Sequence, residues 1–518
     1  MVNYFEKGLR GTVVVSIFTI LAYLSGYLTR LFLARTITTE EFGLFYSVFT
    51  LFMFVCVFTD LGYSTALVKF IPEFLVKKKK ELVLKTIFYV FIITFFLSII
   101  AGVLLFLARG LLSSYYFKTP AAMPLLFVFV FILAFNAVVA LFSSIFQAYQ
   151  NMFRYGLLSF LNKFLFLALC IILFYLGAFK GVFLPGIAYF LTVALLVIIF
   201  AVPFYRKIKH FELEKAEPKN QRFDKKLFLK MSRFAFPNLL TAIAGTFIGY
   251  IDTLILTYMV PLAMVGVYNA VLPTVLILSQ FGGVIATVFF PMLSELWAKK
   301  DYSRMQHGIS MIYRYCLLLT LPFSFAALFF AAPILRILFG TSFVIGANAL
   351  RILSLGMIFL TLAQVNFSVL NGIGKPKEVT KIVVFAAVFN TVINLILIPV
   401  MGISGAALTT TLSYFIMLAW SYVSMRKNIQ FKAEKSWSII TLSFIFLGLL
   451  YFFKRIFSLT QPSMSLYLEA AISLAVSFLV YAALAFLLKC ITFDELKRIL
   501  KNAMRLRGSV PASVPPKD

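Results

Sequence analysis

The sequence predicts an all-α membrane protein of about 14 transmembrane helices, arranged as two pseudo-symmetric six-helix bundles plus two extra C-terminal helices. Three observations predict this fold class. Hydrophobic residues make up 62% of the 518 residues, including 62 Phe, which is more apolar surface than a soluble protein can bury. Apolar runs long enough to span a membrane recur along the whole chain. The chain also repeats itself weakly at offsets of 219–223 residues.

The predicted spans are runs of about 20 mostly apolar residues, the length that crosses a bilayer. They lie at 11–35, 42–68, 84–108, 122–148, 157–177, 183–205, 234–259, 265–291, 309–334, 347–370, 379–399, 404–425, 436–453 and 466–488. The first run is too long and too polar for a secretory signal peptide, so we expect a retained helix.

The basic residues predict the orientation. The chain carries 47 Lys and Arg against 19 Asp and Glu, a formal net charge of +28, and they fall in short gaps between the apolar runs. This placement disfavours nucleic acid as a partner. With a cytoplasmic N-terminus, the inner segments hold 38 basic residues and the outer loops 7, while Arg30 and Arg351 lie within apolar runs. Because positive residues favour the cytoplasmic side, we expect a multi-pass protein of the cell membrane with both termini cytoplasmic.

The internal repeat divides the chain into two like halves. Gly43 matches Gly266 at an offset of 223, and Glu73 matches Glu295 more roughly. The offset covers six spans, an even number, so both halves enter the membrane in the same direction and should be related by an axis along the membrane normal. Two such bundles that rock against each other are typical of an alternating-access transporter.

The repeat and the charged gaps also predict the division of the chain. We expect an N-terminal six-helix bundle at 1–205, a cytoplasmic linker at 206–233, a C-terminal six-helix bundle at 234–425, two additional transmembrane helices at 426–488 and a basic cytoplasmic tail at 489–518.

Polar side chains recur on single faces of several predicted spans, where they must meet protein or water rather than lipid. In span 11–35, spacings of three and four residues align Thr12, Ser16, Thr19, Tyr23, Gly26 and Arg30. Helix packing explains the Ser, Thr and Gly positions, whereas stripes that include a charge indicate a wet cavity. The candidates for substrate binding in this cavity are Arg30, Tyr23, Asp252, Asn269, Gln280, Arg351, Gln364, Asn390 and Asn394.

The charges inside the spans lead to sharper expectations. Arg30 and Asp252 occupy matching positions of the two halves, and we expect them to meet across the cavity as an ion pair that closes the outer side. Asp60 and Asp252 are candidates for coupling to a proton or a sodium ion. The simpler alternatives are that Arg30 and Arg351 reach toward the lipid head groups and that Asp60 caps or braces an inner loop.

Other kinds of site find little support. The four cysteines lie far apart and only two histidines occur, so we expect neither a disulfide framework nor a metal site. No nucleotide-binding loop of the Walker type is present. We therefore expect no cofactor and no catalytic residues, and a protein that is not an enzyme.

Four stretches carry a family resemblance. They are EEFGLF at 40–45 with DLGYSTAL at 60–67; Asp252 with VGVY at 265–268 and FPMLS at 290–294; LNGIGKP at 370–376; and Pro399 with GISGAAL at 402–408 and SY at 413–414. With the fourteen spans, the chain resembles the polysaccharide transporter family of the multidrug/oligosaccharidyl-lipid/polysaccharide exporter superfamily. That family includes O-antigen-type and lipid-linked oligosaccharide flippases.

The resemblance implies a flippase that moves a polyprenyl-diphosphate-linked oligosaccharide or polysaccharide repeat unit from the inner to the outer leaflet by alternating access. Arg30 and Arg351 would bind the anionic head group, because arginine binds phosphate with paired donors. The implied partners are the lipid-linked oligosaccharide, membrane lipids, and a glycan polymerase or glycosyltransferases.

Three alternatives stay open. The first is an ion-coupled multidrug-type exporter of small amphipathic molecules, and the second is a flippase for a peptidoglycan lipid precursor. Peptidoglycan lipid flippases typically have an Arg-Asp pair in the first span, where this chain has Thr29-Arg30, which disfavours that role. The third is a membrane scaffold of a glycan-assembly complex, which would not need the duplication or the polar stripes.

Overall fold

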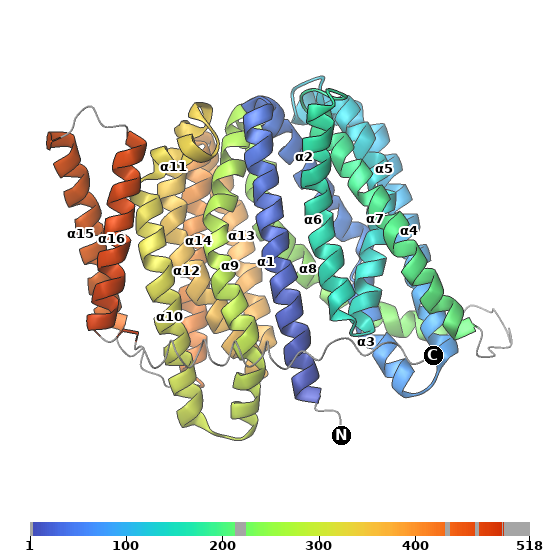
Figure 1. Cartoon of the computed structure of the whole chain (residues 1–518). Coiled ribbons are helices and arrows are strands. Elements are labelled where there is room, and N and C mark those ends of the chain that lie inside the picture. Colours follow the sequence, from blue (N-terminus) through green and yellow to red (C-terminus); the bar gives the residue numbers. More distant parts are fainter. Residues whose placement is uncertain (1–3, 213–223, 430–435, 461–465, 489, 492–518) are drawn as a thin grey trace.

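In the computed structural model, the described residues are 4–212, 224–429, 436–460, 466–488 and 490–491, and these ranges are helical without a β-strand (Figure 1). The first half comprises α1 (Tyr4–Thr36), α2 (Thr39–Asp60), α3 (Tyr63–Val76), α4 (Lys80–Leu111), the π-helical turn η1 (Leu112–Tyr116), α5 (Ala122–Ala148), α6 (Met152–Tyr175) and α7 (Phe183–Glu212).

The second half comprises α8 (Lys225–Met259), α9 (Leu262–Ala298), α10 (Tyr302–Phe329), α11 (Ala331–Leu338), the 3-10 turn η2 (Thr341–Gly346), α12 (Ala347–Gly372), α13 (Pro376–Met401) and α14 (Ile403–Arg426). Two further helices follow, α15 (Ser436–Thr460) and α16 (Leu466–Leu487). We call the side on which α1 begins the near side, and the opposite side the far side.

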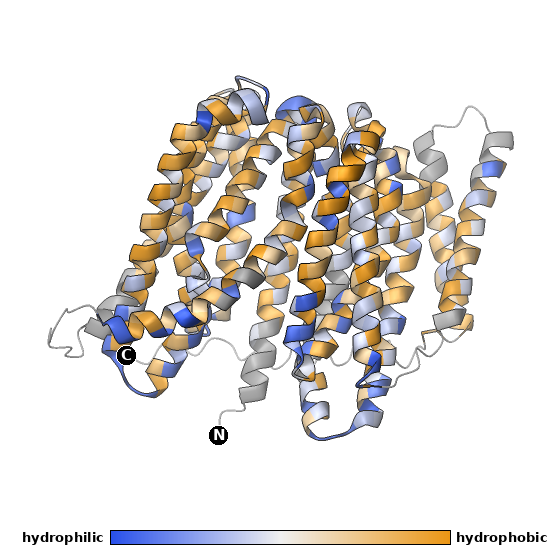
Figure 2. Ribbon diagram, turned by 180° about the vertical axis from the view of Figure 1, so that it is seen from behind, coloured by the Kyte–Doolittle hydropathy of each residue, from blue (hydrophilic) through white to orange (hydrophobic). Residues whose placement is uncertain are grey.

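The predicted number of membrane helices agrees with the structure. Within the described ranges, eleven helices are long and apolar enough to cross a membrane, and three shorter apolar stretches lie in α9, α15 and α16. Large apolar side chains such as Phe96 and Leu107 of α4 are exposed, as expected for a surface in contact with lipid. Figure 2 shows apolar residues along the lengths of the helices and hydrophilic residues concentrated at their ends and turns.

The two halves share one packing plan, which confirms the predicted pseudo-symmetry. In the first half α1 packs along α6, α4 along α5, and α6 along α7; in the second half α8 packs along α13, α10 along α12, and α13 along α14. Across the interface, α2 contacts α8 and α9, and α9 contacts α1. The helices α15 and α16 pack against each other and against α10 and α11, apart from the other half (Figure 1).

The predicted span 42–68 is not one helix. It breaks after Asp60, because Leu61 and Gly62 both adopt positive φ, 47° and 78°, and α3 then starts in a new direction. The Asp60 carboxylate accepts hydrogen bonds from the backbone N–H groups of Gly62 (3.1 Å) and Ser64 (3.2 Å), which caps α3. A Cβ at Gly62 would lie 2.5 Å from the Ala235 carbonyl oxygen of α8, so the break also seats α3 against the other half.

Two other boundaries differ from the prediction. The linker 206–233 is shorter than expected, since α7 continues to Glu212 and α8 begins at Lys225; its centre, 213–223, lies outside the described residues. The span 309–334 belongs to α10, which ends at Phe329 and is followed by the separate short helix α11. The tail 489–518 lies outside the described residues except for 490–491.

Candidate functional site

The two halves come into close backbone contact where α2 crosses α9 at the far side. Gly43 of α2 and Gly266 of α9, which are equivalent in the repeat, lie at this crossing. A Cβ at Gly43 would lie 1.9 Å from the Leu262 carbonyl oxygen, and a Cβ at Gly266 would lie 2.3 Å from that of Thr39. Because real Cβ atoms do not approach other atoms so closely, only glycine permits this crossing. The far side is therefore closed in this conformation.

Cationic side chains of the first half bind backbone carbonyls of the second half on the same side. Arg35, at the end of α1, donates to carbonyl oxygens at the end of α11, including that of Leu338 at 3.2 Å. Lys118, in the turn before α5, donates from Nζ to the Tyr258 carbonyl oxygen at the end of α8, at 2.9 Å. The last carbonyls of a helix carry partial negative charge, so these bonds reinforce the closed far side.

Arg30 lies deeper on α1 and also joins the halves. Its Nη1 donates to the Asn269 carbonyl oxygen of α9 at 2.8 Å, and its guanidinium lies 4.0 Å from the centre of the Tyr46 ring. One turn earlier on α1, the Tyr27 hydroxyl lies 3.1 Å from the Thr274 hydroxyl of α9. The positive charge of Arg30 is thus held by neutral partners.

Lys163 is a second cation beside Arg30, in the middle of α6. Its side chain runs along α1, with Cδ 3.8 Å from the point that a Cβ on Gly26 would occupy, and its Nζ lies 5.9 Å from the centre of the Phe49 ring. The two cations interact electrostatically. Among the described residues, neither has a carboxylate within ion-pair distance. Two half-buried cations without a counter-ion form a site suited to an anion.

Asp252 is the centre of a buried polar cluster within the second half. Its carboxylate accepts hydrogen bonds from the Tyr268 hydroxyl of α9 (2.6 Å), the Thr410 hydroxyl of α14 (2.5 Å) and the Asn394 amide of α13 (2.6 Å). Asn394 also donates to Asn390 Oδ1 at 3.0 Å. Four helices therefore converge on one carboxylate, and three charge-assisted hydrogen bonds compensate its burial.

The same cluster offers oxygen ligands to a small cation. The Oδ1 atom of Asn394 is buried and has no hydrogen-bond partner among the described residues. The Asp252 carboxylate, Asn390 Oδ1 and the Thr410 hydroxyl of the same cluster are hard oxygen donors of the kind that bind small cations. A proton or a monovalent cation would neutralise the buried charge.

The predicted ion pair between Arg30 and Asp252 is not formed, although the far side is closed. Asp252 is fully engaged by donors of its own half, and Arg30 instead bonds to the backbone of Asn269. The expectation was wrong because matching depth in the two halves does not set the direction in which each helix face points. Arg30 still connects the two halves, but through a neutral carbonyl.

The other predicted residues are distributed differently. Asn269 joins the interface through its carbonyl, and its amide donates to the Thr253 hydroxyl at 3.3 Å. Tyr23 is about half exposed on α1, and Tyr250 of α8 interacts electrostatically with it and with Arg30. Gln364 of α12 has a buried Oε1 without a hydrogen-bond partner among the described residues.

Arg351 joins neither cluster. Arg351 is exposed at the far-side end of α12, where its Nη1 donates to Asn348 Oδ1 at 2.7 Å. Its position agrees with the alternative of interfacial anchoring. The side chain of Gln280 lies outside the described residues, although its backbone belongs to α9.

Asp60 caps α3 and also lines a cavity of about 100 Å³ between α2, α3, α4 and α5. The cavity wall includes Thr94 and Asn136, whose amide donates to the Cys56 sulfur at 3.5 Å. The backbone hydrogen bonds to Asp60 confirm the capping alternative, and its carboxyl group also borders the cavity.

The sequence comparisons give the family. A family model described as "Polysaccharide biosynthesis protein" matches residues 9–297, more than half of the chain. The chain belongs to this family. A second model, MatE, matches residues 237–396. An uncharacterized membrane protein of Methanocaldococcus jannaschii is 30% identical over 460 residues, which cover 86% of this chain and 89% of that protein. A probable low-salt glycan biosynthesis flippase of Haloferax volcanii, Agl15, is 26% identical over 51% of this chain and 55% of its own length.

Solved structures share the fold of this family member. A lipid II flippase MurJ in an inward closed conformation superposes with a TM-score of 0.72 at 18% identity, over 91% of this chain and 98% of that one. An inward-facing multidrug transporter of the MATE family gives a TM-score of 0.59 at 14% identity, over 81% and 98%. These likenesses show the fold, which agrees with the resemblance inferred from the motifs.

Sequence reasoning missed three residues of the two clusters. Lys163 lies inside an apolar run, yet it was counted with the neighbouring inner loop, so the available signal was overlooked. Thr410 stands in a run of three threonines in α14, and Tyr268 ends the VGVY motif. Threonine and tyrosine are common in membrane helices as packing residues, so only their convergence on Asp252 reveals their role.

Proposed function

We propose that this protein is a flippase that moves a polyprenyl-diphosphate-linked oligosaccharide, or a polysaccharide repeat unit, from the inner to the outer leaflet of the cell membrane. The observation that carries the proposal is the pair Arg30 and Lys163 of a polysaccharide biosynthesis family member. These are two cations in the membrane-spanning part that have no carboxylate partner among the described residues. The proposed orientation places the near side in the cytoplasm, on the strength of the 38 to 7 distribution of basic residues.

The chemistry of the head group explains why a protein is needed. A bare diphosphate costs far more to bury in hydrocarbon than a hydroxyl, and each unpaired sugar hydroxyl costs several kcal/mol, about 2–7. The present partners of Arg30 are a backbone carbonyl and an aromatic ring. A phosphate exchanges readily with such neutral partners, because charge-assisted bonds are about twice as strong. The lipid tail can remain in the bilayer.

Arg30 connects this chemistry to alternating access. Its bond to Asn269 helps to hold α1 against α9 at the closed far side. A diphosphate that binds Arg30 and Lys163 removes this bond and favours separation of the two halves. The head group then gains a path to the outer leaflet. A glycan polymerase or glycosyltransferases on either side would supply and consume the substrate.

The Asp252 cluster is the proposed site of coupling to a proton or a monovalent cation, with Asp60 as a second candidate in the first half. The cluster also favours a second function, an ion-coupled exporter of small amphipathic molecules. Relatives named as lipid II flippases, such as MurJ of Bacillus subtilis at 24% identity over 39% of this chain, keep a peptidoglycan precursor as a further substrate class.

A reconstituted transport assay tests the proposal. Liposomes that contain the protein receive a fluorescent polyprenyl-diphosphate oligosaccharide in one leaflet, and a membrane-impermeant quencher reports the arrival of the head group. Arg30→Gln and Lys163→Gln should each lower the rate about tenfold or more, because each removes a charge-assisted bond to phosphate. Arg351→Gln is the matched control and should transport like the wild type, since it lies away from both clusters.

Two results would refute the proposal. Normal transport by the double variant Arg30→Gln, Lys163→Gln would show that these cations do not bind the head group. The second result has two parts: the wild-type protein moves the lipid-linked oligosaccharide no faster than protein-free liposomes do, and it exports amphipathic dyes. This result would favour the exporter.

A further inference from the structure

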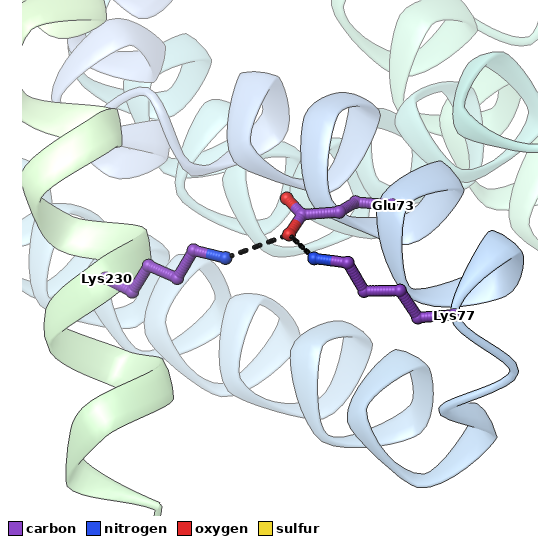
Figure 3. A network of polar contacts seen from close by, with 3 residues as sticks. All are labelled: Glu73, Lys77 and Lys230. Atoms are coloured by element: carbon purple, nitrogen blue, oxygen red, sulfur yellow. Dashed lines mark hydrogen bonds and ion pairs between the residues drawn. The ribbon is translucent and has the colours of Figure 1, made fainter.

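One carboxylate lies between two lysines on the near side, and it joins the halves there. Glu73 of α3 accepts hydrogen bonds from Lys77 Nζ, one turn along, at 2.6 Å and from Lys230 Nζ of α8 at 3.2 Å (Figure 3). Among the ion pairs of the described residues, Glu73–Lys230 is the one that connects the first half to the second. All three side chains remain accessible to water, with Lys230 49% and Glu73 29% exposed.

The surrounding contacts keep α3 against α8. The Tyr63 hydroxyl lies 2.8 Å from the Ser232 hydroxyl, and Lys69 Nζ lies 3.9 Å from the centre of the Phe234 ring. These are a neutral hydrogen bond and a cation–π contact, and each is weak at an accessible site. Apolar packing of α3 against Met231 and Ala235 of α8, with the close approach of Gly62 to the Ala235 carbonyl oxygen, also joins the halves here. The polar contacts are the part of this interface that an anion can replace.

Positive charge dominates this patch. Neighbouring carboxylates are engaged elsewhere, since Glu81 pairs with Lys85 at 2.5 Å and Asp224 caps α8 through the Leu227 N–H at 3.0 Å. Among the described residues, Glu73 is thus the carboxylate that pairs with Lys77 and Lys230. The basic residues that surround it on α3, the following turn and the start of α8 are Lys69, Lys77, Lys78, Lys79, Lys80, Lys225, Lys226, Lys230 and Arg233.

We propose that the near-side patch around Lys77 and Lys230 is the docking site for the diphosphate of the lipid-linked substrate, and that Glu73 is a built-in competitor that occupies it until the substrate arrives. A diphosphate carries more charge and more acceptor oxygens than a carboxylate, so it replaces Glu73 on both lysines. Docking breaks the ion pair from Lys230 to Glu73, which weakens the contact between α3 and α8 and favours opening of the cytoplasmic side. The inference rests on the proposed function, which identifies the ligand.

The second half provides an internal comparison. Glu295 and Lys299 stand 222 residues after Glu73 and Lys77, and they form the same pair one turn apart on α9. No ion pair among the described residues connects Glu295 to the first half. The repeat thus carries the carboxylate–lysine pair twice, and one copy bridges the two halves. Glu295→Gln is therefore a matched control for Glu73→Gln.

The experiment measures ligand affinity and near-side opening together. The full chain, with its native cysteines replaced, is spin-labelled at Val76→Cys of α3 and Leu229→Cys of α8, which are both exposed. It is placed in nanodiscs of neutral phosphatidylcholine and titrated with polyprenyl diphosphate or with polyprenol of the same length. A parallel set of nanodiscs contains phosphatidylglycerol in place of the added ligand. The diphosphate should lengthen the distance between the labels, whereas polyprenol and phosphatidylglycerol should leave it unchanged.

The variants Glu73→Gln and Lys230→Gln should shift the affinity for polyprenyl diphosphate in opposite directions. Glu73→Gln removes the competitor, so the near side opens without ligand and the diphosphate binds about two- to fivefold more tightly. Lys230→Gln also opens the near side, but the diphosphate binds about two- to fivefold more weakly. Loss of folding would weaken binding in both variants, so opposite shifts exclude it. Glu295→Gln should behave like the wild type.

Several outcomes would overturn the docking site: opening by polyprenol or by phosphatidylglycerol alone, affinity shifts of the same sign for Glu73→Gln and Lys230→Gln, or an effect of Glu295→Gln equal to that of Glu73→Gln. Transport in liposomes separates this inference from the proposed function. A protein that transports with unchanged affinities in the variants refutes the docking site alone. A protein that shows opposite shifts but transports no lipid-linked oligosaccharide keeps the docking site and refutes the flippase.

Discussion

Replacing the crossing glycines should open the far side of the protein. We expect Gly43→Ala and Gly266→Ala to shift the protein toward a conformation in which α2 and α9 have separated. The added methyl group would lie 1.9 Å from a carbonyl oxygen at Gly43 and 2.3 Å at Gly266, whereas ordinary van der Waals contact begins near 3.4 Å. The helices must therefore move apart by about 1–1.5 Å at the crossing, because backbone atoms cannot yield as a flexible side chain does.

The energetic consequence follows from this overlap. Overpacking a well-packed contact costs about 1–3 kcal/mol, and every 1.4 kcal/mol changes an equilibrium about tenfold. The ratio of far-side closed to far-side open protein should fall by about 5- to 150-fold in each variant. Arg35 and Lys118 keep their carbonyl partners only while the helix ends stay in place, so their bonds should be lost with the crossing.

The assay measures the distance across the far side by EPR, with labels at the exposed positions Tyr115 of η1 and Ile337 of α11. The matched control is Gly249→Ala on α8, because a Cβ at Gly249 would meet no heavy atom within 4 Å. We expect a longer distance in Gly43→Ala and Gly266→Ala, and the wild-type distance in Gly249→Ala. A wild-type distance in all three variants, or the same lengthening in the control, would refute the view that glycine packing closes the far side.

Three further predictions concern Asp252, the near-side ion pair between Glu73 and Lys230, and the topology. Asp252→Asn should remove any dependence of transport on protons or sodium and lower stability by about 1–3 kcal/mol, because it replaces a charged acceptor of three donors; unchanged ion dependence would contradict this role. The hydrogen bonds from Lys77 and Lys230 lower the pKa of the Glu73 carboxyl. The bond to Lys230 should therefore persist above the ordinary glutamate pKa of about 4.3 and be lost as the pH falls through the lowered pKa. In the EPR measurement of near-side opening, the near side of Glu73→Gln should be open at neutral pH and should not respond to acid. Finally, a cysteine at Ser114 should label from outside intact cells and one at Gln221 only after lysis, and the reverse pattern would refute the proposed orientation.

The fold class followed from local properties of the chain. Whether a segment crosses the membrane depends on the summed transfer free energy of about 20 neighbouring residues, which any window of the sequence contains. The repeat was visible as a constant offset, and the shared packing plan of the two halves confirms it. The break at Leu61 and Gly62 was not predicted, although the polar stretch TDLGYST at 59–65 interrupts the apolar run there; the structure adds that Gly62 lies close against α8.

The candidate site was predictable only as a set of separate residues. Asp252, Asn390 and Asn394 stood out as polar groups in apolar spans, and the structure brings them together. The partner of Asp252 was predicted to be Arg30, and it is instead a group of neutral donors from its own half. Lys163 was available in the sequence, yet it was counted with the neighbouring inner loop, and only the structure shows that its side chain runs along α1.

By itself, the sequence determined the number and order of the membrane helices, their duplication and several of the polar groups among them, such as Arg30, Asp252 and Asn394, because each of these depends on composition along the chain. The tertiary structure decided which of those groups meet. That outcome depends on the rotation and depth of each helix, and close packing at contacts such as Gly43 with Gly266 sets both. For this reason Arg30 lies beside Lys163 and Asn269, Asp252 lies beside Thr410 and Tyr268, and Glu73 reaches Lys230 across the two halves.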